Sequence, residues 1–128
     1  MLLGGGGKIE RLTVRQAMDT AGNRLLAIEV TGTRSIPVLS QLVVLQPGTY
    51  RLTWKTPDTD PAKARALQVT LDCTATLGKA AAGTPATGQP GTWTQNFAVD
   101  QTCKAQRLIF WLPPNTPIHL DDVTLTGL

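Results

Sequence analysis

Two stretches decide the fold: residues 47–54 read PGTYRLTW, and residues 118–125 read IHLDDVTL. In the first, a Pro-Gly turn is followed by alternating apolar and polar side chains, the period-2 pattern of a half-buried strand. The apolar members are Tyr50, Leu52 and Trp54, and the polar members are Arg51 and Thr53, with Lys55 continuing the alternation just after the stretch. In the second stretch, Val123 and Leu125 are expected to close the core. Together the two stretches predict a small all-β sandwich.

Length and composition agree with one such domain. The chain has 128 residues, of which only 16% are charged, and Thr, Gly, Pro and β-branched residues are plentiful. This balance favours short strands joined by turns. We expect a single β-sandwich domain over 8–128 and a flexible linker or domain boundary over the glycine-rich residues 1–7. Because no apolar stretch approaches about 20 residues, we expect no membrane insertion.

Further strands follow from the same patterns. The segments 8–16, 24–31, 36–45, 67–73, 93–99 and 108–112 are expected strands, and the chain ends in another. Residues 56–64 are expected to form a polar loop, and the Gly-, Pro- and Ala-rich segment 78–91 a long exposed one. The aromatic residues expected in the core are Tyr50, Trp54, Trp93, Phe97 and Phe110.

The net charge of +3 does not point to a nucleic-acid partner. The twelve Lys and Arg residues are scattered along the chain, and no basic run or aromatic-interleaved stripe appears. A nucleic-acid interface needs clustered positive charge. We therefore interpret these residues as a solvated surface.

The order of several motifs resembles a known family. PGTYRLTW, ALQVTL, WTQNFAV, RLIFWL and HLDDVTL follow one another as in the jelly-roll, galactose-binding-like carbohydrate-binding modules, over about residues 24–128. The resemblance implies an antiparallel jelly-roll β-sandwich and a polysaccharide or glycan as ligand. It also implies a structural calcium near the last strand. The aromatic-bearing opening segment of the family is missing here.

The two cysteines have two interpretations. Cys73 ends an expected strand on its inward phase, and Cys103 lies 30 positions later, just before RLIFWL. In a sandwich they could form a disulfide, or they could stay as two buried thiols in a reducing compartment. The even count and the exported context that the resemblance implies favour the disulfide.

Catalysis is poorly supported by the sequence. His119 is the only histidine and has no evident nucleophile beside it, and the only glutamates are Glu10 and Glu29. Nucleophilic catalysis needs a base next to the nucleophile, and glycoside hydrolysis needs two carboxylates across a cleft. We expect no enzyme. Asp121 and Asp122 could supply oxygen ligands to calcium or could serve an ordinary turn, and the sequence leaves both open.

Trp111 is the strongest candidate for ligand contact. It alternates with the expected core residues Phe110 and Leu112, so it should point away from the core. An exposed Trp can stack on the apolar face of a sugar ring. The outward phases of neighbouring expected strands suggest a polar surface for the same ligand. The candidate binding residues are Trp111, Arg107, Arg51, Thr53, Lys55, Gln68, Thr70 and Asp72.

These observations predict a noncatalytic carbohydrate-binding module in a larger exported protein that is periplasmic, secreted or on the cell surface. Its partners would be a polysaccharide or glycan and other domains of the parent protein. The alternative is a structural or protein-interaction β-sandwich in a surface or polysaccharide-export assembly, because only one stacking aromatic is evident.

Overall fold

The computed structural model describes residues 11–18, 22, 24–57, 59–73, 81–82, 84–85 and 91–128. The expected linker over 1–7 lies outside them. The strands are β1 (Arg11–Met18), β2 (Arg24–Thr31), β3 (Ile36–Val43), β4 (Gly48–Lys55), β5 (Gln68–Cys73), β6 (Ala81–Ala82), β7 (Thr84–Pro85), β8 (Thr92–Val99), β9 (Gln106–Leu112) and β10 (Ile118–Gly127). A short helix, α1 (Pro61–Ala64), precedes β5. Across the described ranges, no helix has the length and apolar character that crossing a membrane requires.

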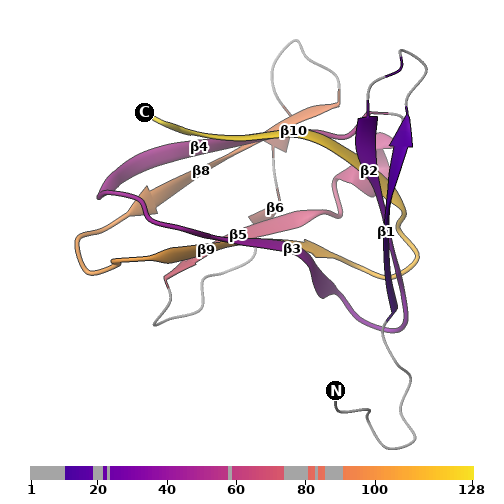
Figure 1. The fold of residues 1–128 in the computed structure, drawn as a ribbon, viewed down its shortest axis with the longest axis horizontal. Coiled ribbons are helices and arrows are strands. Elements are labelled where there is room, and N and C mark those ends of the chain that lie inside the picture. The colour runs from indigo at the N-terminus through magenta and orange to yellow at the C-terminus, as the bar shows by residue number, and fades with distance from the viewer. Residues whose placement is uncertain are drawn as a thin grey trace, which may run out of the picture.

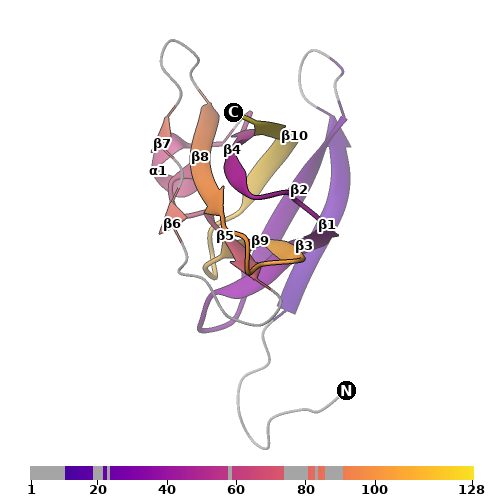
Figure 2. The ribbon, with the colours of Figure 1, turned by 90° about the vertical axis from the view of Figure 1, so that its left-hand side faces the viewer.

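These strands pack as an antiparallel β-sandwich (Figures 1 and 2). The large sheet has the order β1-β2-β10-β4-β8-β7, and the small sheet has the order β3-β9-β5-β6. From β2 to β5, and again from β8 to β10, each successive strand lies in the other sheet. This alternation is the jelly-roll topology, and it confirms the fold expected from the sequence.

The core lies between the two sheets and is centred on Trp54. Its ring meets the ring of Phe110 edge-on, with the centroids 5.7 Å apart and the planes at 88°. Trp54 comes from the large sheet and Phe110 from the small one, so this pair joins the two layers. The other expected core aromatics differ in depth: Trp93 is buried, whereas Tyr50 and Phe97 are partly exposed.

The expected polar loop over 56–64 contains buried residues and a helix. Asp60 caps α1 by accepting a hydrogen bond from the backbone N–H of Ala62 at 2.9 Å, and Pro61 takes the first helical position. Ala64 is buried. Thr56 is buried too, and its hydroxyl accepts a hydrogen bond from the indole N–H of Trp93 at 2.8 Å. This connection therefore closes one end of the core.

The segment 78–91, expected to be a long exposed loop, includes short paired strands where it is described. Residues 81–82 pair with β5 in the small sheet, and residues 84–85 pair with β8 in the large sheet. The chain therefore passes from one layer to the other within this segment. The remaining residues of the expected loop, apart from Gly91, lie outside the described ranges.

The last strand, β10, contains a β-bulge, which changes the direction in which Val123 points. Asp121 pairs with Lys55 and Thr124 with Thr53, so two residues of β10 stand opposite one residue of β4. Asp122, in the bulge, has a φ of 50°. The bulge turns Val123 outward, where it is 42% exposed, so the expectation that Val123 closes the core is wrong. Leu125 lies beyond the bulge and packs against the core as expected.

A disulfide joins Cys73 to Cys103, with the Cα atoms 5.5 Å apart. This confirms the pairing that the sequence favoured over free thiols. It ties the end of β5 to the turn that leads into β9, two neighbouring strands of the small sheet. The closed loop spans 30 positions and includes β8 of the large sheet, so the bond also limits how the layers can separate.

Candidate functional site

Trp111 lies on the outer face of the small sheet. Its neighbours along β9, Phe110 and Leu112, are buried in the core, whereas Trp111 is partly exposed. Its indole N–H donates a hydrogen bond to the hydroxyl of Thr70 on β5 at 3.0 Å. The ring is therefore held in one orientation on the sheet face.

Three of the predicted binding residues, Thr70, Gln68 and Arg107, share this face of the small sheet with Trp111. Gln68 stands directly opposite Trp111 in the pairing of β5 with β9, and Arg107 is on the same face of β9. Gln68 and Arg107 are both exposed. We call Trp111, Thr70, Gln68 and Arg107 the Trp111 surface. It combines a fixed aromatic ring with polar groups that are open to solvent.

Two residues expected on an exposed face are buried instead. Thr70 is 2% exposed and Asp72 is 5% exposed, although their strand phase points away from the core. Thr70 is bonded to the Trp111 indole, and Asp72 stands directly opposite Arg107. Short side chains between such long neighbours lose their exposure. The expectation of solvent-facing Thr70 and Asp72 is wrong, and Thr70 acts by holding Trp111.

The other three predicted residues lie on the opposite side of the molecule. Arg51, Thr53 and Lys55 are on β4, which belongs to the large sheet. The Arg51 Nε donates to the Asn96 side-chain oxygen at 3.3 Å on neighbouring β8. Strand order therefore separates these residues from Trp111, and the eight candidates do not form one surface.

Asp121 and Asp122 already have partners at the bulge. An oxygen of Asp121 accepts the backbone N–H of Asp122 at 2.9 Å, and Asp122 forms an ion pair with Lys55 at 3.1 Å. Among the residues that the structure describes, no group of three or more Asp, Glu, His or Cys side chains converges as a metal site would require. These contacts are those of a turn, and calcium at this position stays a prediction.

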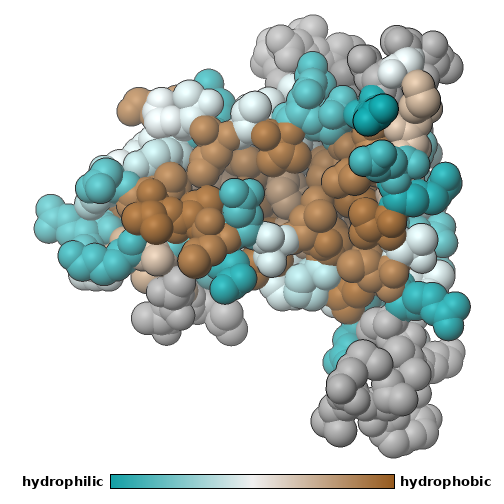
Figure 3. All heavy atoms as spheres, in the orientation of Figure 1, coloured by the Kyte–Doolittle hydropathy of each residue, from teal (hydrophilic) through white to brown (hydrophobic). Residues whose placement is uncertain are grey.

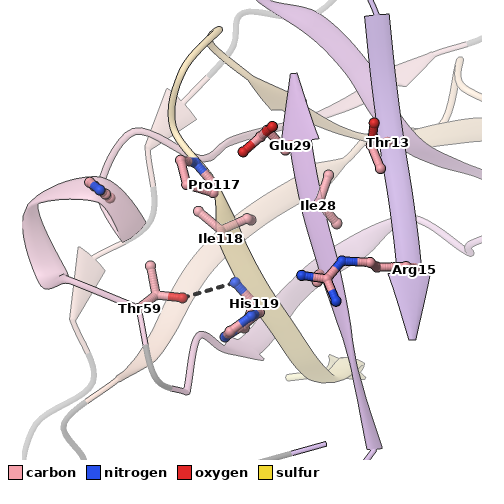
Figure 4. A pocket seen from close by; sticks show the side chains of 10 residues that line it. Thr13, Arg15, Ile28, Glu29, Thr59, Pro117, Ile118 and His119 are labelled. Atoms are coloured by element: carbon pink, nitrogen blue, oxygen red, sulfur yellow. Dashed lines mark hydrogen bonds between the residues drawn. The ribbon is translucent and has the colours of Figure 1, made fainter. Parts of the chain in front are cut away.

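A cleft of about 300 Å³ lies on the outer face of the large sheet (Figure 4). Its floor is Ala27, which stands directly opposite Arg15 of β1 on one side and His119 of β10 on the other. Ile28 and Ile118 point into the core, so their neighbours along the strands, Ala27 and Glu29 on β2 and His119 on β10, face outward. A methyl group between two long side chains leaves a hollow. We call it the Ala27 cleft.

Polar side chains surround this floor. They are Thr13 and Arg15 on β1, Glu29 on β2, His119 on β10, and Thr59 and Lys63 from the connection that carries α1. Figure 4 shows Arg15 reaching across β2 toward His119, whereas Glu29 leans toward Pro117. Within the described part of the chain, the charged groups of Arg15, Glu29 and Lys63 have no hydrogen-bond or ion-pair partner.

His119 is anchored through its backbone. Its N–H donates to the Thr59 hydroxyl at 2.8 Å, while its ring nitrogen Nδ1 is buried and has no partner in the described structure. Buried polar atoms are usually hydrogen-bonded, and among the described residues this nitrogen and the indole nitrogen of Trp54 are the exceptions.

The Ala27 cleft was missed at the level of sequence. The scattered positions of Arg15 and Lys63 predict only a solvated charged surface, and His119 has no evident nucleophile beside it in the sequence. Thr13 and Arg15 share one face of their strand, as do Ala27 and Glu29, because each pair is two residues apart. Only the pairing of β1, β2 and β10 brings these faces together.

Comparisons with known proteins give no relative: no family model, no curated protein and no solved structure matches this chain.

Proposed function

We propose that this chain is a noncatalytic carbohydrate-binding domain that holds a polysaccharide or glycan on the Trp111 surface. One observation carries the proposal: a partly exposed indole ring is held on a sheet face by its hydrogen bond to Thr70. Sugar rings present apolar C–H faces, which stack on flat aromatic side chains. Exposed Gln68, directly opposite Trp111, can donate a hydrogen bond to a sugar hydroxyl at the ring. Exposed Arg107, four residues along the same face of β9, can donate to a more distant part of a glycan.

The hydrogen bond to Thr70 also favours binding entropically. A side chain that is free to rotate loses rotamer freedom when a ligand orders it, at a cost of about 0.5–1.5 kcal/mol. Because Trp111 is already fixed, this cost is lower. Preorganised aromatic anchors of this kind are common where binding energy is concentrated.

Two further features support an exported, noncatalytic role. The Cys73–Cys103 disulfide is of the kind that persists in oxidising compartments, so we place the domain in a periplasmic, cell-surface or secreted protein. Glycoside hydrolysis needs two carboxylates on either side of the bond. The one carboxylate beside the Trp111 surface in the described structure, that of Asp72, is buried.

The test is a glycan array followed by affinity electrophoresis in the retaining polysaccharide. Trp111→Ala is expected to weaken retention at least tenfold, whereas Trp111→Phe, which keeps an aromatic face, should retain part of it. Arg51→Ala, on the large sheet, is the control and should bind like the parent. Circular dichroism checks that each variant is folded. Unchanged retention in Trp111→Ala, or an array without a hit, would overturn the proposal.

A second candidate function, protein interaction, is favoured by apolar side chains along the edge where β3 of the small sheet lies near β10 of the large sheet. Figure 3 shows hydrophobic groups gathered on this side of the molecule. Val44 and Leu42 are 72% and 55% exposed, and Leu39, Leu120 and Val123 help to line a hollow of about 260 Å³. Exposed apolar patches often mark interaction sites. Specific capture of a protein that Leu42→Asp abolishes, together with an empty glycan array, would favour this function.

A further inference from the structure

We propose that the Ala27 cleft is a separate binding site for an acidic sugar, such as a hexuronate residue. The cleft is on the large sheet, and the Trp111 surface is on the small sheet. The inference is therefore independent of glycan binding at Trp111 and can fail or succeed without it.

The shape of the cleft fits a small ligand. Ala27 is 8% exposed and stands in line with Arg15 and His119 across three paired strands. Directly opposite residues have Cβ atoms about 4.5–5.5 Å apart, so a ligand over the Ala27 methyl group would touch the side chains on both sides. The volume of about 300 Å³ is at the lower end of the range for small-molecule sites. This is room for one or two sugar rings.

The charges select an anion. Arg15 and Lys63 approach from different elements, and neither has a partner among the described residues. Among the described residues that line the cleft, Glu29 is the one carboxylate, so these side chains carry a net positive charge. An arginine side chain can bind both oxygens of a carboxylate with its planar fork. A carboxylate bound to Arg15 would supply the partner that this guanidinium lacks.

The remaining groups select a hydroxylated ligand over a bare anion. Glu29 repels phosphate or sulfate, but its carboxylate accepts hydrogen bonds from sugar hydroxyls. Figure 4 shows Glu29 and Arg15 directed to different parts of the cleft, so one molecule can place a carboxylate at Arg15 and a hydroxyl at Glu29.

The experiment is an NMR titration of the isotope-labelled chain with five separate probes: glucuronate, a trimeric uronate oligosaccharide, glucose, inorganic phosphate and the zwitterion glycine. Either uronate is expected to shift the amide signals of Arg15, Ala27, Glu29 and His119, and binding of the oligosaccharide alone would identify an acidic polysaccharide as the source. No shift with either uronate at about 10 mM would overturn the proposal. Equal binding of glucose, phosphate or glycine would overturn it too.

Variants locate the site. Arg15→Ala is expected to weaken uronate binding at least tenfold, and Ala27→Leu, which fills the hollow, to abolish it. Arg51→Ala removes the same charge from the same sheet and should leave binding unchanged. If Ala27→Leu does not fold, Glu29→Gln provides a second measurement: it should reduce the preference for uronate over phosphate. Uronate binding that is unaffected by both Arg15→Ala and Glu29→Gln would rule out the cleft.

Discussion

The indole N–H of Trp111 donates a hydrogen bond to the hydroxyl of Thr70, 3.0 Å away on the adjacent strand β5. This contact explains both the burial of Thr70 and the partial exposure of Trp111. Thr70 is buried because the ring covers it, and Trp111 remains only partly exposed because its edge is turned into the sheet. The ring that we propose for sugar stacking is therefore a positioned group.

Replacing Thr70 by Val is expected to destabilise the fold by about 1–2 kcal/mol, because the indole N–H loses its acceptor in a partly buried place. Thr70→Ser, which keeps the hydroxyl, should cost less. Urea unfolding measures both. Glycan retention should weaken in Thr70→Val but remain stronger than in Trp111→Ala. Equal stability of the Val and Ser variants would show that the hydrogen bond does not stabilise the fold.

The two core tryptophans should respond differently to replacement by Phe. Trp93 donates its indole N–H to Thr56, whereas the indole nitrogen of Trp54 is buried and has no partner in the described structure. Both substitutions leave a similar void, but only Trp93→Phe also breaks a hydrogen bond. We expect Trp93→Phe to cost about 1 kcal/mol more than Trp54→Phe in chemical unfolding. A larger loss in Trp54→Phe would contradict this account.

Removal of the disulfide in Cys73→Ala/Cys103→Ala is expected to lower the free energy of unfolding by about 3.5 kcal/mol. The value follows from the entropy that a closed loop of 30 positions removes from the unfolded chain. Thermal unfolding of the parent with and without reductant gives an independent measure. If the double variant and the reduced parent are both as stable as the oxidised parent, the bond does not stabilise the domain.

Asp100 should make stability depend on pH in acid. The Thr102 hydroxyl and then its backbone N–H donate to this carboxylate and hold its pKa below the usual range. A lowered folded-state pKa stabilises the protein above the unfolded-state pKa, and this contribution disappears as pH falls through the folded-state value. Asp100→Asn keeps an acceptor oxygen but cannot ionise. Its deficit relative to the parent should exist at neutral pH and shrink in acid, as measured by urea unfolding across pH. A deficit that grows in acid would contradict the direction.

Asp122→Gly distinguishes the two interpretations of the bulge. The left-handed φ of 50° favours glycine, and the ion pair with Lys55 is exposed. If Asp122 serves only the turn, Asp122→Gly should lower the free energy of unfolding by no more than about 0.5 kcal/mol. Thermal unfolding with calcium and with EDTA should then give the same midpoint for the parent. A calcium-dependent rise in the midpoint that Asp122→Gly abolishes would instead assign structural calcium to this site.

The strands themselves were predictable because their signal is local. Successive side chains of a strand point to opposite faces, so the alternation around Leu52 and Trp54, and around Phe110 and Leu112, identifies core positions without knowledge of the partners. The same rule placed the side chains of Trp111 and Phe110 on opposite faces of their strand. The phase and spacing of the two cysteines left the disulfide and free thiols both open, and the even cysteine count together with the exported context implied by the resemblance favoured the disulfide that the structure shows.

The sequence by itself determined the β-rich character, the inward-facing residues of the central strands and the nomination of Trp111. Only the tertiary structure decided which strands are neighbours. Strand order put Arg51 and Lys55 on the sheet opposite Trp111, register put Thr70 beneath the indole, and the bulge turned Val123 outward. The Ala27 cleft exists because three strands distant in sequence align Arg15, Ala27 and His119. Cross-strand pairing is non-local, and a period-2 pattern specifies the face of a residue but not its neighbour on that face.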